Sequence, residues 1–429
     1  MNVLSPKNSA PLTVTDFLIL SLLALMPFVN VGSPSPWLPA PMIMGLLLFA
    51  WLAITRNFSL DGTFLSFIIL SEISFLPWIF SGDMVSLKTL LHALALITSI
   101  TIYYATTKCA ISVYLARRSA EDILRVFYFA LLFTSVFIIV EFLGINGRIP
   151  DVTRLVPYTQ AAQFDAYALG TLHRPRGFAT EPGVMALFYD LSLFVVLPLL
   201  ANGWRWRVGY YLIIVPAYFV LFSTASLGST MVALIALTLW SIRRRFLTTS
   251  GKIAAILSAL ALVLVIGGTP MWKLVTDQTT YRVATLVLGT GNDTSAIERR
   301  GRFAEVENVV YRYPLGIGFG IAAGLPAKGG KYRGIELSSG QVSLIGTFLV
   351  AGGIPAGILA GLMVVVTLIR AINIPRFGPY IAAGGLAISI HELTVTEYWL
   401  PYFWLFFALT NAFSYQSLQR PLTHSASVA

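Results

Sequence analysis

A short polar segment, LHRPRGFATEPG (Leu172–Gly183), interrupts a mostly apolar sequence and contains the first residues that could do chemistry. Arg174 and Arg176 flank a proline, whose ring fixes its own φ and holds the residue before it in an extended conformation. Two guanidinium groups on so stiff a backbone could stabilise an anion, because planar guanidinium groups form bidentate hydrogen bonds. Glu181 is expected near the positive end of the helix that Pro182 begins, or paired with an arginine. Alternatively, the arginines meet lipid head groups at the interface.

A second cluster of basic residues begins a predicted helix over 296–312. A capping box at its start, Ser295 with Glu298, and a proline after its end delimit this helix. Its predicted apolar stripe consists of Phe303, Val306, Val310 and Tyr313, with Arg299 at the N-terminal end. An arginine on a buried face needs an anionic partner, so Arg299, Arg300 and Arg302 are candidates for anion binding. Alternatively, Arg299 extends past the helix end, and Arg300 and Arg302 are solvated.

Several ionisable residues lie within apolar runs. A charged group is costly there, so such residues usually have a function or form hydrogen bonds between helices. They are Glu72, His92, Glu141, Asp190, His391 and Glu392. His391 and Glu392, with Glu397, are expected toward the outer end of a predicted span, where they are candidates for a general base.

The run Gly316-Ile-Gly318-Phe-Gly320 resembles a dinucleotide fingerprint only superficially, because no strand precedes it. A tight re-entrant turn accounts for it better.

These residues must be positioned by membrane helices. The chain has 429 residues, of which 56% are hydrophobic and 11% charged, and its mean hydropathy is +0.77. Such a composition is typical of a polytopic membrane protein. The first apolar run, Phe17–Val31, lacks a small-residue cleavage site and is expected to be a retained helix. The single cysteine, Cys109, excludes an intramolecular disulfide and a multi-cysteine metal site.

Apolar windows of about 17–25 residues predict twelve membrane spans. They lie near 16–32, 38–54, 63–80, 86–105, 123–143, 182–201, 208–223, 227–242, 252–269, 342–369, 378–393 and 396–414. Alternate short connections contain arginine or lysine, among them Arg56, Lys108, Arg205, Arg243 and Arg370, and the opposite short connections contain none. This positive-inside pattern predicts that both termini are cytoplasmic.

Two long connections are predicted on the outer side, and both are basic. The expected organisation is helices 1–5 (1–143), a first large loop (144–181), helices 6–9 (182–268), a second, partly helical loop (269–341), and helices 10–12 with a cytoplasmic tail (342–429).

The order of these features resembles the O-antigen polymerase and O-antigen ligase superfamily. The resemblance covers Leu172 to Gly357. It rests on the arginine loop that opens a helix, the tip Ser223–Gly228, the arginine-led helix that ends in Pro314–Gly318, and Gly352–Gly357.

Membership would imply a GT-C-type membrane glycosyltransferase that uses undecaprenyl-diphosphate-linked glycans at the periplasmic face of the bacterial inner membrane, without metal or other cofactor. It would place Arg174, Arg176, Arg299, Arg300 and Arg302 on the diphosphate. Arg176, Arg299, Glu181, His391 and Glu392 are then the candidate catalytic residues.

The sequence departs from the family pattern at two places. The ligases have a His-Asn pair before the span that follows the second loop, whereas this chain has Glu336–Gln341 there, which favours a polymerase. Leu227 stands where the family pattern has an arginine near the tip.

The expected function is therefore a polysaccharide polymerase that transfers a glycan from its undecaprenyl diphosphate carrier to a lipid-linked repeat unit. The alternatives are an O-antigen ligase that transfers glycan to lipid A-core and, from another class, an exporter of a lipid-linked or anionic substrate. Expected partners are the lipid-linked oligosaccharide, membrane lipid, and a chain-length regulator and flippase of the same pathway, but not nucleic acid.

Overall fold

The computed structural model describes residues 11–32, 34–35, 38–81, 86–160, 173–201, 203–224, 294–321, 331–332, 335–336, 343–393 and 398–425. This part of the chain is almost entirely helical. Its strands are β1 (Lys331–Tyr332) and β2 (Ile335–Glu336), a short antiparallel pair in the second large loop. The prediction of a helical protein is therefore confirmed.

The helices follow the predicted spans. They are α1 (Val14–Leu25), α2 (Ala40–Ile54), α3 (Gly62–Ser81), α4 (Leu87–Ser99), the π-helix η1 (Ile100–Thr106), α5 (Thr107–Arg117), α6 (Ala120–Ile145), the 3₁₀ helix η2 (Val152–Leu155), α7 (Pro182–Val195), α8 (Leu197–Leu200), α9 (Trp204–Gly209), the π-helix η4 (Tyr210–Ile214), α10 (Val215–Thr224), α14 (Thr294–Arg312), α16 (Leu344–Ile372), α17 (Gly378–His391) and α18 (Pro401–Ser425). The predicted spans 227–242 and 252–269 lie outside the described residues.

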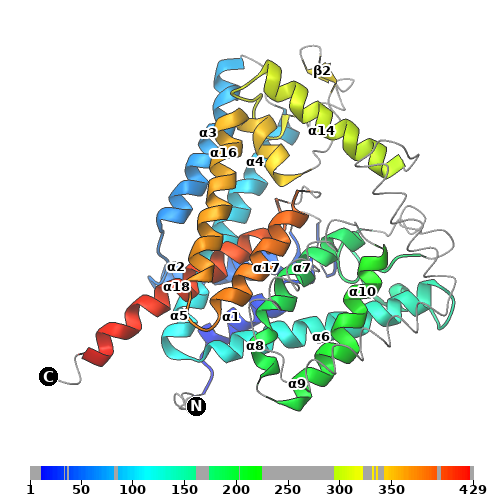
Figure 1. Ribbon diagram of the computed structural model, residues 1–429, viewed down its shortest axis with the longest axis vertical. Coiled ribbons are helices and arrows are strands. Elements are labelled where there is room, and N and C mark those ends of the chain that lie inside the picture. Colours follow the sequence, from blue (N-terminus) through cyan, green and yellow to red (C-terminus); the bar gives the residue numbers. More distant parts are fainter. Residues whose placement is uncertain are drawn as a thin grey trace.

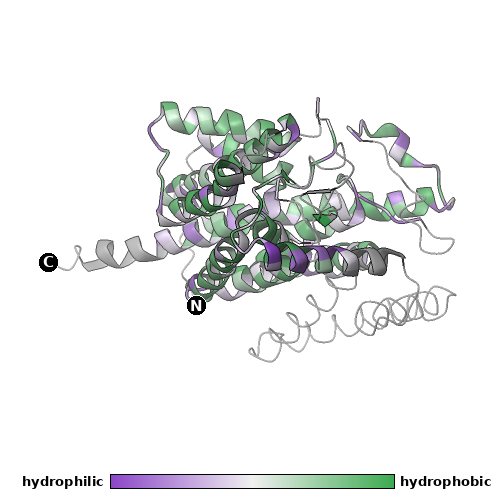
Figure 2. Cartoon of the chain, turned by 90° about the horizontal axis from the view of Figure 1, so that it is seen from above, coloured by the Kyte–Doolittle hydropathy of each residue, from purple (hydrophilic) through white to green (hydrophobic). Residues whose placement is uncertain are grey.

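Four helical stretches in the described ranges are long and apolar enough to cross a membrane. They are Gly62–Phe80, Leu87–Arg117, Ala120–Ile145 and Leu344–Ile372. Exposed apolar side chains mark the surface of the longest helix, α16, at Ile354, Ile358, Leu362, Val365 and Ile369. Their spacing of three or four residues places them on one face, which suits lipid rather than water. Apolar residues likewise predominate on most helices (Figure 2), which indicates a membrane protein.

Helix packing brings distant parts of the chain together. In Figure 1, α3 and α16 lie side by side along the long axis of the molecule, and α14 crosses their upper end. Helix α17 packs against α7, and α18 packs against α5. Helices from the two halves of the sequence therefore pack directly against each other.

Two predicted helix boundaries were wrong. Helix α1 ends at Leu25 rather than near residue 32, because Pro27 cannot continue a helix. The fourth span continues without a break through η1 and α5 to Arg117, so Lys108 lies within a helix and not in a loop. Its side chain remains buried because it forms an ion pair with Asp61 at 3.4 Å.

Helix α16 is kinked at Gly352–Gly353. Gly353 has φ 65° and ψ −156°, a conformation that is essentially restricted to glycine. Two residues later, Pro355 has no N–H to donate to the carbonyl of Ala351. The kink therefore leaves backbone groups without their usual helical partners, which is costly inside a membrane.

The segment Pro314–Gly320 supplies the missing partners. Its backbone hydrogen bonds to the kink run from Ile317 N to Val350 O (2.9 Å), from Gly318 N to Ala351 O (2.8 Å), and from Ile354 N to Pro314 O (2.9 Å). A further bond runs from Phe319 N to Ser74 O (2.8 Å) on α3. The predicted tight turn is present, and these amides donate to the carbonyls of membrane helices.

Helix α14 spans 294–312, close to its predicted bounds. Val306, Val310 and Tyr313 of the predicted stripe pack in a buried cluster, but Phe303 does not. Val306 and Val309 are 8% and 0% exposed, whereas Phe303 is 47% exposed. The buried valines pack with Ile317 and Val350, so contact with the kinked part of α16 selects the face. The predicted stripe was therefore wrong at Phe303.

Candidate functional site

The arginine segment (His173–Glu181) leads directly into α7, and Arg176 within it is one of the largest fully buried side chains of the described chain. Its guanidinium carbon lies 3.8 Å from the centre of the Tyr158 ring, and its Nη1 donates to the carbonyl of Gln160 at 3.0 Å. A cation over an aromatic face is stabilised electrostatically. Contacts on two sides thus orient the guanidinium group.

Glu141, near the end of α6, holds the backbone of the same segment. Its Oε2 accepts hydrogen bonds from the backbone amides of Arg176 at 3.1 Å and Gly177 at 2.7 Å. Glu141 is 0% exposed, and these two amides satisfy one of its buried carboxyl oxygens. The sequence placed Glu141 among the ionisable residues of the spans, but its spacing from Arg176 gave no sign of this contact.

Tyr158 contacts both the backbone and a side chain of the arginine segment. Its hydroxyl donates to the carbonyl of Gly177 at 2.9 Å, while its ring carries the Arg176 guanidinium. Burial raises the pKa of the Tyr158 phenol, and the carboxylate of Glu141 raises this pKa further. The phenol therefore remains a hydrogen-bond donor at neutral pH.

The structure describes fewer contacts for the other predicted anion-binding residues. Arg174 is half-buried beside Arg176, and Arg302 is half-buried on α14. Arg299 and Arg300 lie in the first turns of α14, and their side chains are outside what the structure describes.

Glu181 is the N-cap residue of α7, and Pro182 occupies the first turn as predicted. The Glu181 side chain makes no capping hydrogen bond. Within the arginine segment, the described carboxylate contacts to the backbone come from Glu141 instead.

A second buried polar group joins α7, α10 and α17. The Oδ2 atom of Asp190 lies 2.6 Å from Nδ1 of His391, and its Oδ1 accepts a hydrogen bond from the hydroxyl of Tyr218 at 2.6 Å. Asp190 and His391 are 1% and 0% exposed. The geometry suits a carboxylate that orients an imidazole and selects its tautomer.

Glu392 follows His391 and is 2% exposed. Its carbonyl accepts a hydrogen bond from Leu344 N at 2.9 Å, which ties the end of α17 to the start of α16. His391 and Glu392 are thus packed inside the helical body, whereas the sequence suggested a base at the outer surface. Glu397 lies outside the described residues.

The remaining ionisable residues of the spans have different surroundings. Glu72 lies on an exposed face of α3. His92 on α4 forms a hydrogen bond through Nδ1 with the hydroxyl of Tyr398, and Tyr398 packs edge-on against Phe319 of the glycine-rich turn. His92 therefore links α4 to the segment before α18.

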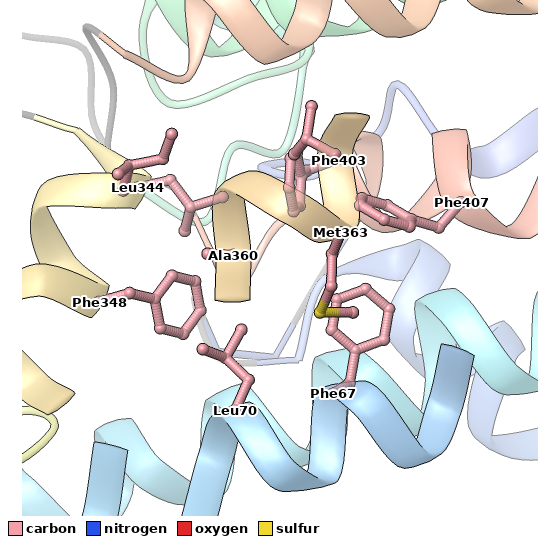
Figure 3. A pocket seen from close by; sticks show the side chains of 10 residues that line it. Phe67, Leu70, Leu344, Phe348, Ala360, Met363, Phe403 and Phe407 are labelled. Carbon is pink, nitrogen blue, oxygen red and sulfur yellow. The ribbon is translucent and has the colours of Figure 1, made fainter. Parts of the chain in front are cut away.

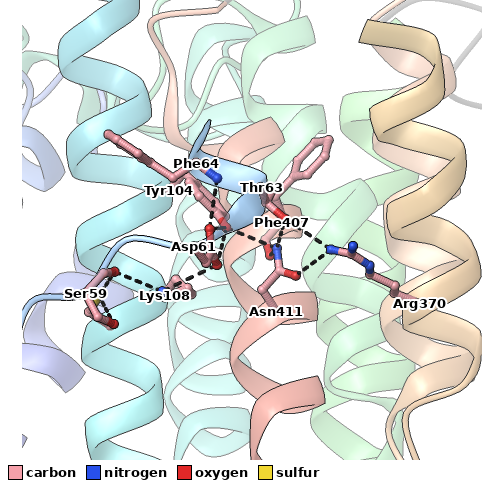
Figure 4. A network of polar contacts seen from close by, with 10 residues as sticks. Ser59, Asp61, Thr63, Phe64, Tyr104, Lys108, Arg370, Phe407 and Asn411 are labelled. Carbon is pink, nitrogen blue, oxygen red and sulfur yellow. Dashed lines mark hydrogen bonds and ion pairs between the residues drawn. The ribbon is translucent and has the colours of Figure 1, made fainter. Parts of the chain in front are cut away.

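A polar network joins the start of α3 to α5, α16 and α18 (Figure 4). Asp61 accepts hydrogen bonds from the hydroxyl of Tyr104 at 2.7 and 2.8 Å and pairs with Lys108. Asn411 donates to the Tyr104 hydroxyl at 3.2 Å, and Arg370 donates to the Asn411 side-chain oxygen at 3.4 Å. These bonds connect elements that are far apart in the sequence, so the network is primarily structural.

A narrow apolar pocket lies between α3, α16 and α18 (Figure 3). Its lining includes Phe67, Phe348, Met363, Phe403 and Phe407, and no ionisable side chain. None of the predicted site residues lines it. In the described part of the chain, no group of three or more His, Cys, Asp or Glu residues is arranged to hold a metal ion.

Comparison with protein-family models and with curated proteins finds no match to this sequence.

Proposed function

We propose that this chain is a GT-C-type, metal-independent glycosyltransferase with twelve membrane spans. It would transfer a glycan from undecaprenyl diphosphate to a lipid-linked repeat unit and so polymerise O-antigen or exopolysaccharide. The site would face the periplasm, and both termini would lie in the cytoplasm. The proposal rests on the sequence resemblance and on one structural observation. Arg176 is held by Tyr158, Gln160 and Glu141 where a membrane helix ends.

A fixed guanidinium group suits this reaction. When the bond between the anomeric carbon and the phosphate oxygen breaks, negative charge develops on the leaving diphosphate. A donor that is already oriented stabilises this charge without reorganising during the reaction. Arg174 lies two residues away on the same segment and would bind the same group. Arg299, Arg300 and Arg302 on α14 would approach from the second loop.

The acceptor hydroxyl must lose a proton as the new bond to the anomeric carbon forms. His391 is the proposed acceptor of that proton, because Asp190 orients its ring. Glu392 and Glu181 remain the other candidates.

The test is to incubate the purified full-length protein with an undecaprenyl-diphosphate-linked repeat unit and to separate the products on a gel. A ladder of products supports a polymerase. Transfer of one block to a lipid A-core acceptor would show a ligase instead. If neither substrate combination yields a new glycosidic bond, the chain is not a transferase of this class.

The exporter remains a second candidate because Asp190, His391 and Tyr218 form a buried polar group between three helices. Such groups carry protons in membrane transporters. A transferase should tolerate Glu72→Gln but lose polymerisation with Arg176→Lys or Arg299→Lys. An exporter that uses the buried group should instead keep its substrate flux into proteoliposomes with Arg176→Lys and lose it with Asp190→Asn.

A further inference from the structure

The backbone of the arginine segment is held at four consecutive residues. The amides of Arg176 and Gly177 donate to Glu141 Oε2, and the carbonyl of Gly177 accepts from the Tyr158 hydroxyl. The carbonyls of Phe178 and Ala179 accept from the backbone and side-chain nitrogens of Asn30, at 2.9 and 3.3 Å. Residues from three separate regions of the chain therefore fix the course of this segment.

Gly177 makes the bend that presents its amide to Glu141. Its φ is 60°, a left-handed conformation that side chains disfavour. A Cβ at this position would lie 3.0 Å from the terminal methyl group of Met185. Because the bend places two successive amides on one oxygen, Glu141 sets the position from which the Arg176 side chain extends.

Burying the Glu141 carboxyl group costs free energy, which its hydrogen bonds to the arginine segment offset. The residue lies in an apolar helix, and its Oε1 is buried without a hydrogen-bond partner in the described part of the chain. An apolar residue of similar length would fill the same space without burying a carboxyl group. Compared with an apolar residue, Glu141 therefore adds the two hydrogen bonds that its Oε2 accepts from the arginine segment.

We infer that Glu141 is the positioning residue of a diphosphate-binding site: its Oε2 fixes the backbone of Arg176 and Gly177 and thereby aims the Arg176 guanidinium at the anion. This inference rests on the proposed function and extends it to a residue on α6. Glu141 itself does not contact the substrate. It acts through the arginine.

Two substitutions of similar length separate hydrogen bonding from packing. Glu141→Gln keeps an oxygen that accepts from the two amides, whereas Glu141→Met fills the space and accepts nothing. Thr134→Val is the matched control. Thr134 lies two turns earlier on α6, is 0% exposed, and within the described ranges its hydroxyl donates to Ala130 O of its own helix. All three variants should be monodisperse in detergent before they are compared.

The first measurement is polymerisation by the full-length protein as a function of donor concentration. We expect Glu141→Met to lower kcat/KM about 100-fold, as a displacement of about 1 Å in a catalytic group does. Glu141→Gln should recover activity to within about tenfold of the wild type, because its side-chain oxygen can still accept hydrogen bonds from the two amides. Thr134→Val should match the wild type.

The second measurement is binding of inorganic diphosphate to the same proteins by calorimetry, which does not depend on turnover. We expect weaker binding by Glu141→Met than by Glu141→Gln, with an unchanged unfolding temperature for the control. If the wild type polymerises but Met and Gln at position 141 behave alike, the positioning role is refuted and the function stands. If the wild type binds diphosphate and Glu141→Met weakens this binding, yet no glycosidic bond forms, the function is refuted and the anion site stands. If the wild type neither polymerises nor binds diphosphate, both are refuted.

Discussion

Asp190 and His391 are 201 residues apart in the sequence, yet their side chains meet at 2.6 Å inside the helical body. Tyr218 completes the group from a third helix. Because the pair is buried, removing one residue deprives the other of a buried hydrogen bond. The contact therefore couples α7, which follows the arginine segment, to α17, whose end is bonded to the start of α16.

Replacing Asp190 with leucine should destabilise the protein by about 3–5 kcal/mol, since His391 and Tyr218 would be left buried without their partner. Asp190→Asn should cost less, because its oxygen can still accept from Tyr218. Unfolding in detergent, followed by intrinsic fluorescence, measures the difference. Ser192→Ala is the control, because the Ser192 hydroxyl is buried without a partner among the described residues. An equal loss from Leu and Asn would contradict the hydrogen-bonded arrangement.

Arg176→Lys should reduce polymerisation about 100-fold, which is typical of removing one oriented donor from a transition-state site. A lysine carries the charge but cannot both lie flat on the Tyr158 ring and donate in a bidentate way. The product ladder measures the effect. Arg154→Lys in the same predicted loop is the control, since the Arg154 side chain is 86% exposed. Equal activity of the two variants would show that Arg176 is not in the site.

Tyr158→Phe should reduce polymerisation slightly, and Tyr158→Leu should reduce it strongly. Phenylalanine keeps the aromatic face under Arg176 and loses the hydrogen bond to Gly177, which contributes about 0.5–1.5 kcal/mol to stability. Leucine also loses the cation–π contact, which orients the guanidinium group. Activity and unfolding temperature are measured together. If Phe and Leu reduce activity equally, the ring does not orient the arginine.

Gly353→Ala should destabilise the protein by about 1–3 kcal/mol, because Gly353 has a conformation that alanine rarely adopts. The added Cβ would also overlap the carbonyl of Pro314 and push the glycine-rich turn away from α16. Gly361→Ala lies on the same helix with no atom within 4 Å of the added Cβ, and it should be neutral or slightly stabilising. Thermal unfolding of both variants checks this. A similar effect of the two changes would argue against the kink.

Asp61→Asn should destabilise the protein by about 1–3 kcal/mol, less than a fully buried pair because the Asp61 side chain is 30% exposed. Asparagine still caps α3 and accepts from Tyr104, so the change isolates the charge that neutralises buried Lys108. The double variant with Lys108→Met should recover part of the loss, and a double-mutant cycle of unfolding free energies measures the coupling. Strict additivity would mean that the ion pair contributes nothing.

The helices themselves were predictable because apolar periodicity and capping residues act locally. The capping box at Ser295 and the proline after Tyr313 placed α14 close to its observed bounds, and Pro182 marked the start of α7. The end of α1 was mispredicted although the sequence contained the signal, Pro27. An apolar window does not register that a single missing N–H stops a helix.

The sequence by itself determined which segments are apolar helices and which short stretches gather arginine, because composition and periodicity follow from neighbouring residues. Only the tertiary structure decided that Glu141 holds the backbone of Arg176, that Asp190 meets His391, and that the glycine-rich turn satisfies the kink in α16. These contacts join residues far apart in the chain. Their formation depends on which helix faces pack together, and a hydrophobicity pattern does not specify that choice.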